Sequence, residues 1–161
     1  MGNIIMNRPR QGLSKRKLAH CEAVSQVMWE EATRLGWPQE EAERASFLGF
    51  VHDFGRAFRP DGHSETGADI LEATGCDLAF EVRNHGRLVD GPTPFLAMLW
   101  HADMTCDHEG KRCSYTERLN GIRERYGAES RQAANANALV TWLKANYPEY
   151  ARHQREKEAR P

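Results

Sequence analysis

The residues with the clearest chemical potential are an adjacent histidine and aspartate, His52 and Asp53. His20 lies upstream and Asp103 lies downstream, each on the inward side of a segment with helical periodicity. Burying this many ionisable groups is unfavourable unless something compensates their charge. A divalent cation would do so, because mixed imidazole and carboxylate ligands suit Mn, Fe, Co, Ni or Zn. These four residues therefore predict a metal site gathered from three helices.

Each of the four residues also has an ordinary interpretation when it is taken alone. A histidine on an apolar helix face, such as His20, is more often a hydrogen-bonded core residue than a metal ligand. Asp53 alone would suit a helix C-terminal turn or an ion pair, and Asp103 alone would suit a cap or an arginine partner. The prediction of a metal site therefore depends on the conjunction of all four.

The elements that must position these residues are predicted from helical periodicity, since no stretch alternates convincingly with a period of two. Apolar residues recur at helical spacing in seven segments. These segments are residues 14–35, 38–55, 64–73, 77–84, 94–103, 115–126 and 129–146. We therefore expect an all-α protein with a single compact helical fold.

Local signals mark where several of these helices begin and end. Ser14 is expected to cap the first helix, and Gly36 is expected to end it. Pro38 and Pro94 can open helices, because the first turn tolerates a missing N–H. Gly55 is expected to stop the second helix.

The chain is expected to contain one domain with short extensions. Residues 1–12 are predicted to form a flexible lead-in, residues 13–147 the domain, and residues 148–161 a charged C-terminal helix or tail. Residues 56–62 and 88–93 are predicted to be polar loops, the second rich in Gly, Asp and Pro.

The overall composition of the chain limits the classes of partner that it is expected to bind. With 161 residues the chain can build one core, and its net charge of −1 gives no basic field that favours a nucleic-acid duplex. The four cysteines form no C-x-x-C pair, which favours free thiols in a reducing cytoplasm. The apolar segment 4–6 is too short for a signal core or a membrane span, so no membrane partner is expected. Apolar positions near Trp142, Leu143 and Tyr147 suit either the core or a homodimer interface.

The order His20, His52-Asp53, Asp103 resembles the signature of the HD superfamily of metal-dependent phosphohydrolases. In that superfamily the first helix carries a histidine, the second ends with the His-Asp pair, and a later helix brings the last aspartate. The resemblance covers residues 13–127, most of the chain. It implies the helical HD-domain fold, a bound divalent metal, and hydrolysis of a nucleotide or other small phosphate ester by metal-activated water.

Two further histidines extend the resemblance to members of the superfamily that bind two metals. Residues 63–71, which begin with a histidine and contain Gly-Ala and Ile-Leu pairs, are similar to the segment after the His-Asp pair in those members, and His85 lies where they carry another histidine. Through this resemblance His63 and His85 would bind a second ion, with Asp53 bridging both. The implied cofactor is one or two divalent ions of Mn, Fe, Co, Ni, Zn or Mg. Gly86 departs from the HD-GYP branch, which has a second histidine there and a following Gly-Tyr-Pro, so cyclic-di-GMP hydrolysis is not supported.

Cationic side chains near the ligands are the predicted contacts to a substrate phosphate. Arg56 lies three residues after Asp53, where relatives often carry lysine, and both are predicted to be catalytic. The Arg56 guanidinium could bind a phosphate oxygen bidentately. Arg16 and Lys17 lie one turn before the first histidine and could face the mouth of the site, and Arg59 is a second choice. Each of these cations would also suit an ordinary solvated surface position.

Three functions fit these residues. The first, which we expect, is a phosphohydrolase acting on a small phosphorylated substrate. The second is an HD-fold di-iron oxygenase that cleaves a C–C or C–P bond, since six ligands could hold two irons. The third is a non-enzymatic binding domain with a structural metal or ion-pair network. The complete set of four core ligands argues against the third, because structural metal sites seldom leave open coordination positions.

Overall fold

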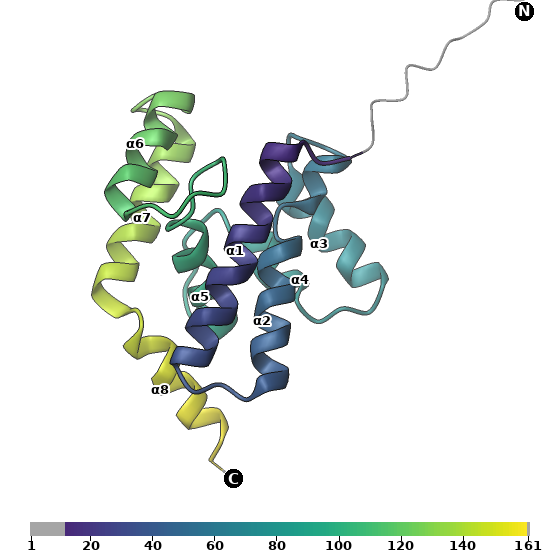
Figure 1. The fold of residues 1–161 in the computed structure, drawn as a ribbon, viewed down its shortest axis with the longest axis vertical. Helices are drawn as coiled ribbons and strands as arrows, with labels where there is room; N and C mark the ends of the chain where they lie inside the picture. Colours follow the sequence, from purple (N-terminus) through teal and green to yellow (C-terminus); the bar gives the residue numbers. More distant parts are fainter. Residues whose placement is uncertain (1–11, 161) are drawn as a thin grey trace, which may run out of the picture.

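The protein, described by a computed structural model over residues 12–160, folds into eight α-helices and one short 3-10 helix (Figure 1). The helices are α1 (Lys15–Arg34), α2 (Gln39–Val51), η1 (Phe54–Ala57), α3 (His63–Ala73), α4 (Ala79–Asn84), α5 (Pro94–Asp103), α6 (Tyr115–Tyr126), α7 (Arg131–Asn146) and α8 (Glu149–Glu158). Within the described residues the extended structure is limited to one isolated bridge between Cys106 and Arg112. The expected all-α fold is confirmed, whereas the predicted lead-in lies outside the described residues apart from Gly12.

Several predicted helix ends are confirmed by their capping interactions. The Ser14 side chain accepts a hydrogen bond from the backbone N–H of Lys17, and Gly36 follows α1 with a left-handed φ of 73°. Ser114 forms a reciprocal capping box with Glu117 at the start of α6. These ends were predictable because the signals that make them lie within a few residues of each end.

Other predicted boundaries were wrong. The second helix ends at Val51, not at Gly55, because the backbone leaves helical geometry at Asp53 (φ −106°, ψ 4°). The predicted loop 56–62 overlaps η1 at its start. α4 begins at Ala79, and α7 begins at Arg131, where Ser130 supplies the cap. By contrast, residues 148–161 were expected to form a helix or a tail, and the structure confirms the helix, α8.

Helix α5 is the centre of the molecule. It packs against α1, α2, α4, α7 and α8, and eight of its ten residues are buried. Phe95, Met98 and Leu99 enter a core cluster built with α1 to α4, whereas Leu96 and Trp100 enter a second cluster built with α6 and α7. In Figure 1, α1 passes in front of α5 with α2 beside α1, and α6 and α7 lie side by side at the other end of the molecule from α8. Because Asp103 ends α5, both core clusters hold that carboxylate in place.

Two further observations bear on the sequence predictions. Leu143 is buried within the second core cluster, and Trp142 and Tyr147 pack against it, so these residues contribute to the core of the chain itself. No helix among residues 12–160 combines the length and the apolar character that crossing a bilayer requires.

Candidate metal centre

The structure brings all six predicted metal ligands into one cluster. These residues are His20, His52, Asp53, His63, His85 and Asp103. They come from α1, the end of α2, the start of α3, the end of α4 and the end of α5. Five segments that are distant in sequence therefore meet at one point.

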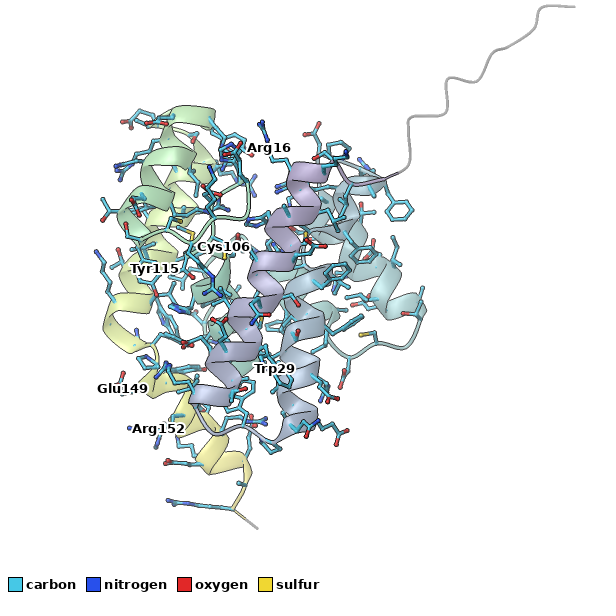
Figure 2. All side chains as sticks on the ribbon, in the orientation of Figure 1. Arg16, Trp29, Cys106, Tyr115, Glu149 and Arg152 are labelled. Atoms are coloured by element: carbon cyan, nitrogen blue, oxygen red, sulfur yellow. The ribbon has the colours of Figure 1, made fainter. Side chains whose placement is uncertain are left out.

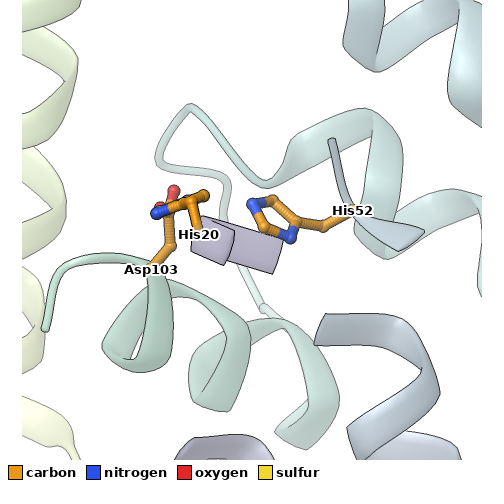
Figure 3. A group of neighbouring side chains, drawn as sticks. All are labelled: His20, His52 and Asp103. Atoms are coloured by element: carbon orange, nitrogen blue, oxygen red, sulfur yellow. The ribbon is translucent and has the colours of Figure 1, made fainter. Parts of the chain in front are cut away.

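The first group consists of His20, His52 and Asp103, and Figure 3 shows the three side chains facing one another. One ligand atom from each residue lies within 4.8 Å of the other two. His20 Nε2 lies 3.0 Å from Asp103 Oδ1. A small contraction would close this group around a metal ion, whose bonds to nitrogen and oxygen are about 2.0–2.2 Å long.

The second group is centred on the Asp53 carboxylate. His63 Nε2 lies 3.0 Å and His85 Nε2 lies 3.3 Å from Asp53 Oδ1. The other carboxylate oxygen, Oδ2, lies 3.7 Å from His52 Nε2 in the first group. Asp53 therefore lies between the two groups, with one oxygen toward each.

Main-chain carbonyls fix the ring orientation of three of the histidines. Nδ1 lies 2.7 Å from the carbonyl oxygen of Asp107 for His20, of Gly49 for His52 and of Val82 for His85. Because a carbonyl oxygen can only accept, each Nδ1 carries the proton and donates it. When these rings are neutral, each Nε2 offers a lone pair toward the cluster, which is how metal-binding histidines are usually held.

This arrangement crowds acceptor atoms together. His20 Nε2, His52 Nε2 and Asp53 Oδ1 are buried and have no hydrogen-bond partner among residues 12–160. Lone pairs of a neutral imidazole and a carboxylate repel each other at about 3 Å, and buried acceptors without partners are unfavourable. A cation bound among them would remove both penalties. The residues present therefore fit a metal ion, on the chemistry of their donor atoms.

The local electrostatics keep most of these ligands in their metal-binding forms. Burial lowers the pKa of His52 to about 4, so its imidazole is neutral at neutral pH. Burial opposes ionisation of Asp53, but the neighbouring imidazoles, His52 first and then His63 and His85, hold its pKa well below the usual range. The adjacent His20 ring and the charge of Arg118 likewise outweigh burial and keep the pKa of Asp103 well below the usual range. Both carboxylates are therefore anionic ligands.

The close approach of η1 to α3 depends on Gly55. A Cβ at this position would collide with the carbonyl oxygen of His63 and would press on the backbone of Gly67. Without a side chain at Gly55, the start of α3 lies directly against the turn that carries Asp53. This contact brings His63 to the Asp53 carboxylate.

The predicted phosphate-binding cations divide into two sets. Lys17 Nζ lies 2.8 Å from Asp53 Oδ2, Arg56 Nε lies 3.3 Å from Asp53 Oδ1, and both residues line the cavity beside the ligands. Arg16 is 64% exposed, lies 3.5 Å from Glu109 and is not among the residues that line this cavity (Figure 2). Arg59 is exposed and likewise lies outside the lining.

Arg118 is a site residue that sequence reasoning missed. Its Nε donates to the backbone oxygen of Asp103 at 3.1 Å, and Nη2 donates to Asp103 Oδ1 at 3.0 Å. Only 9% of the Arg118 side chain is exposed. One signal was present in the sequence, since Arg118 lies four residues before Ile122 and so shares the inward face of α6. The two bonds fix the orientation of the Asp103 carboxylate.

A cavity of about 530 Å³ opens beside the ligands, a volume that suits a small-molecule ligand. The candidate ligands Asp53, His63, His85 and Asp103 are part of its lining. Residues of α6 and α7 also line it. A molecule in this cavity could therefore contact the ligand cluster and both of these helices.

Comparisons with protein-family models, with curated proteins and with solved structures gave no match to this chain.

Proposed function

We propose that this protein is a metal-dependent phosphohydrolase of the HD superfamily that acts on a small phosphate ester. The observation that carries the proposal is the cluster of four histidines and two aspartates, with unpartnered buried acceptor atoms, beside a cavity lined by arginines. The histidine content favours Mn, Fe, Co, Ni or Zn over Mg, because Mg prefers oxygen ligands.

The residues divide between two ions in this proposal. His20, His52 and Asp103 would hold the first, His63 and His85 the second, and Asp53 would contact both. A bound divalent ion supplies a water of lowered pKa, about 7 for zinc, and neutralises charge on phosphoryl oxygens. The anionic carboxylates of Asp53 and Asp103 and the neutral imidazole of His52 are the ligand forms that this chemistry needs.

The protein's own cations would bind and orient the phosphoryl group. Arg56 lies in the cavity wall beside Asp53, and its buried Nε has no hydrogen-bond partner in the described part of the chain. Its guanidinium can therefore donate to a phosphoryl oxygen next to the ligands. Lys17 is the second cation beside the ligands, and Arg118 keeps the Asp103 carboxylate oriented.

A di-iron oxygenase is the second candidate, because the same six ligands could hold two irons. The two candidates differ in the metal found and in the co-substrate consumed. Two irons per chain, oxygen uptake and no phosphate release would favour the oxygenase. Metal-loaded protein that is inert toward both phosphoesters and oxygen would favour a non-enzymatic binding domain.

The decisive experiment measures metal content and phosphate release together. Protein purified without added metal is analysed by elemental mass spectrometry, reconstituted with each candidate ion, and assayed with p-nitrophenyl phosphate and bis-p-nitrophenyl phosphate. We expect near-stoichiometric metal and metal-dependent hydrolysis in the wild type, and loss of both in Asp53→Ala, with helical circular dichroism retained. Asp77→Ala is the matched control, because that carboxylate is 77% exposed and pairs with Arg44. Full activity in Asp53→Ala, or no metal after reconstitution, would contradict the proposal.

A further inference from the structure

The cavity has a strong excess of positive charge. Seven lysine or arginine side chains and four aspartate or glutamate side chains line it, whereas the whole chain has a net charge of −1. Bound divalent ions would increase this excess. A cavity with such a lining concentrates anionic ligands.

Most of these cations already have a carboxylate partner. Lys17 and Arg118 contact the metal-ligand carboxylates. Arg83 contacts three carboxylates of α3 at 2.7–2.8 Å, and Arg87 lies 4.0 Å from one of them. The protein's own carboxylates therefore already balance the charge of these cations.

Arg125 and Arg131 differ from the rest. Neither has a carboxylate within 4.0 Å among residues 12–160, yet both line the cavity, at the end of α6 and the start of α7. Both residues are exposed, and partial burial together with the charge of the nearby Arg118 lowers the pKa of Arg125. Two arginines therefore lie in the same cavity wall without an anion to balance them.

The Arg125 guanidinium is held in place rather than free. Its Nε donates to the carbonyl oxygen of Gly121 at 3.2 Å, and its Cζ lies 5.2 Å from the centre of the Tyr126 ring. These contacts leave its two terminal nitrogens available to a ligand. Arg131 lies in the first turn of α7, where the N-terminal end of the helix dipole adds to the positive potential.

The lining also includes apolar side chains, Met104 after Asp103, Ile122 on α6 and Leu139 on α7. A molecule that contacts both the ligand cluster and the two arginines would therefore also meet apolar surface. The groups that it presents to the cluster and to the arginines would be anionic.

We infer that the cavity binds substrates with two phosphoryl groups, the second held by Arg125 and Arg131. This inference rests on the proposed function, since the first phosphoryl group lies at the ligand cluster. Arginine suits a phosphoryl group because its planar fork of donors matches two phosphate oxygens. Arg125 and Arg131 are specificity residues in this assignment, because they select a doubly phosphorylated substrate over a singly phosphorylated one.

The test compares binding of paired small molecules to metal-loaded protein by isothermal titration calorimetry. The probes are α,ω-alkanediol bisphosphates of two to six carbons, inorganic pyrophosphate, and the matching alkyl monophosphates. At least one doubly phosphorylated probe is expected to bind about tenfold tighter, or more, than its monophosphate partner. The double variant R125Q/R131Q should lose most of that ratio. Arg123→Gln is the matched control, because Arg123 is exposed on the same helix and does not line the cavity.

Three outcomes would overturn the inference. These are equal binding of mono- and bisphosphates across the series, an advantage that survives in R125Q/R131Q, and an equal advantage when a carboxylate replaces the second phosphoryl group. Failure of the proposed function would look different. If bisphosphates bind more tightly through the two arginines but the protein hydrolyses no phosphoester, the second phosphoryl subsite is retained and the proposed phosphohydrolase function is rejected. If the protein hydrolyses phosphoesters but binds bisphosphates no more tightly than monophosphates, the function is retained and the subsite is rejected.

Discussion

The four histidines of the cluster are not held equally. His20, His52 and His85 each donate Nδ1–H to a main-chain carbonyl at 2.7 Å. His63 has no such carbonyl partner within the described residues, and its side chain is 17% exposed at the first position of α3. A ring without this support is less fixed in tautomer and direction. The second ion should therefore be the more weakly bound of the two.

Removing the two histidines of the second group should remove one ion. We expect His63→Ala and His85→Ala each to lower metal content from two ions per chain toward one, because the first group keeps its own ligands. The measurement is elemental mass spectrometry after dialysis at a fixed free metal concentration. His153→Ala on α8 is the control, because its side chain is exposed and distant from the cluster in sequence. Unchanged stoichiometry in both variants would exclude these histidines as ligands.

Arg118 offers a second prediction at the scale of single residues. Arg118→Gln removes the guanidinium that donates to both the backbone and the carboxylate of Asp103. We expect metal affinity to fall about 10–100-fold, as is typical when a group that orients a metal ligand is lost. Competition with a chelator of known affinity measures this change. Arg118→Lys should recover part of the loss, since one of the two bonds can reform, whereas equal affinity in Arg118→Gln and wild type would contradict the orienting role.

At the scale of elements, the packing of η1 on α3 governs the second metal group. Gly55→Ala should force the two segments apart, because its Cβ would collide with the backbone at His63. We expect a loss of about 1–3 kcal/mol in the free energy of unfolding, the usual cost of overpacking, and a lower content of the second ion. Urea denaturation of metal-free protein and elemental analysis test the two effects.

The matched substitution is Gly121→Ala. Gly121 lies inside α6, and a Cβ there would meet nothing within 4 Å. It should stabilise the protein by about 0.5–1 kcal/mol, because alanine is the better helix former. Equal stability of the Gly55 and Gly121 variants would show that the contact between η1 and α3 is not tight.

Gly55 also shows where prediction from sequence reaches its limit. It was expected to stop the second helix, yet the helix ends four residues earlier and the φ of Gly55 is not positive. Its role depends on α3, which packs on it from eight residues further along the chain. By contrast, the ends of α1 and α6 could be predicted because Ser14 and Ser114 act on neighbouring backbone N–H groups.

The site likewise contains features that the sequence could predict and features that it could not. The six candidate ligands were predicted from residue types and an order that resemble a known motif, and the structure places them in one cluster. The cavity and the role of Arg118 could not be predicted, because they depend on how α6 and α7 pack against the end of α5. Arg16 and Lys17 are adjacent in sequence, but only Lys17 faces the cluster, since successive residues of a helix point in different directions.

At the scale of the whole molecule, one partly buried network joins the ends of several helices. His101 on α5 lies 2.6 Å from the hydroxyl of Tyr115 on α6 and stacks on Tyr147 after α7, with ring centres 4.5 Å apart. Tyr147 donates to Glu31 on α1 at 2.6 Å, and Glu31 pairs with Arg34. His101 is thus a member of this network. Four helices are therefore linked by groups that titrate.

This network should make stability depend on pH in a defined direction. Burial lowers the pKa of His101 below its ordinary 6.5, so protonation favours the unfolded chain. The stability that His101 contributes is complete above about pH 6.5 and is lost as the pH falls toward the folded-state pKa. Burial and the bond to Glu31 raise the pKa of Tyr147, so its contribution is complete below about pH 10 and is lost as the pH rises through that range.

Urea denaturation of metal-free protein at a series of pH values tests the loss of stability at acid pH (the acid limb) and at alkaline pH (the alkaline limb). His52, whose pKa is about 4, adds to the acid limb with the same sign, so the comparison must be between variants. His101→Gln should show a shallower fall in the free energy of unfolding below pH 6.5 than the wild type, because the side chain no longer takes up a proton on unfolding. Tyr147→Phe should flatten the alkaline limb alone. If His101→Gln leaves the acid slope unchanged, His101 has the same pKa in the folded and the unfolded chain. The packing of Tyr147 on the His101 ring would then not disfavour the protonated imidazole.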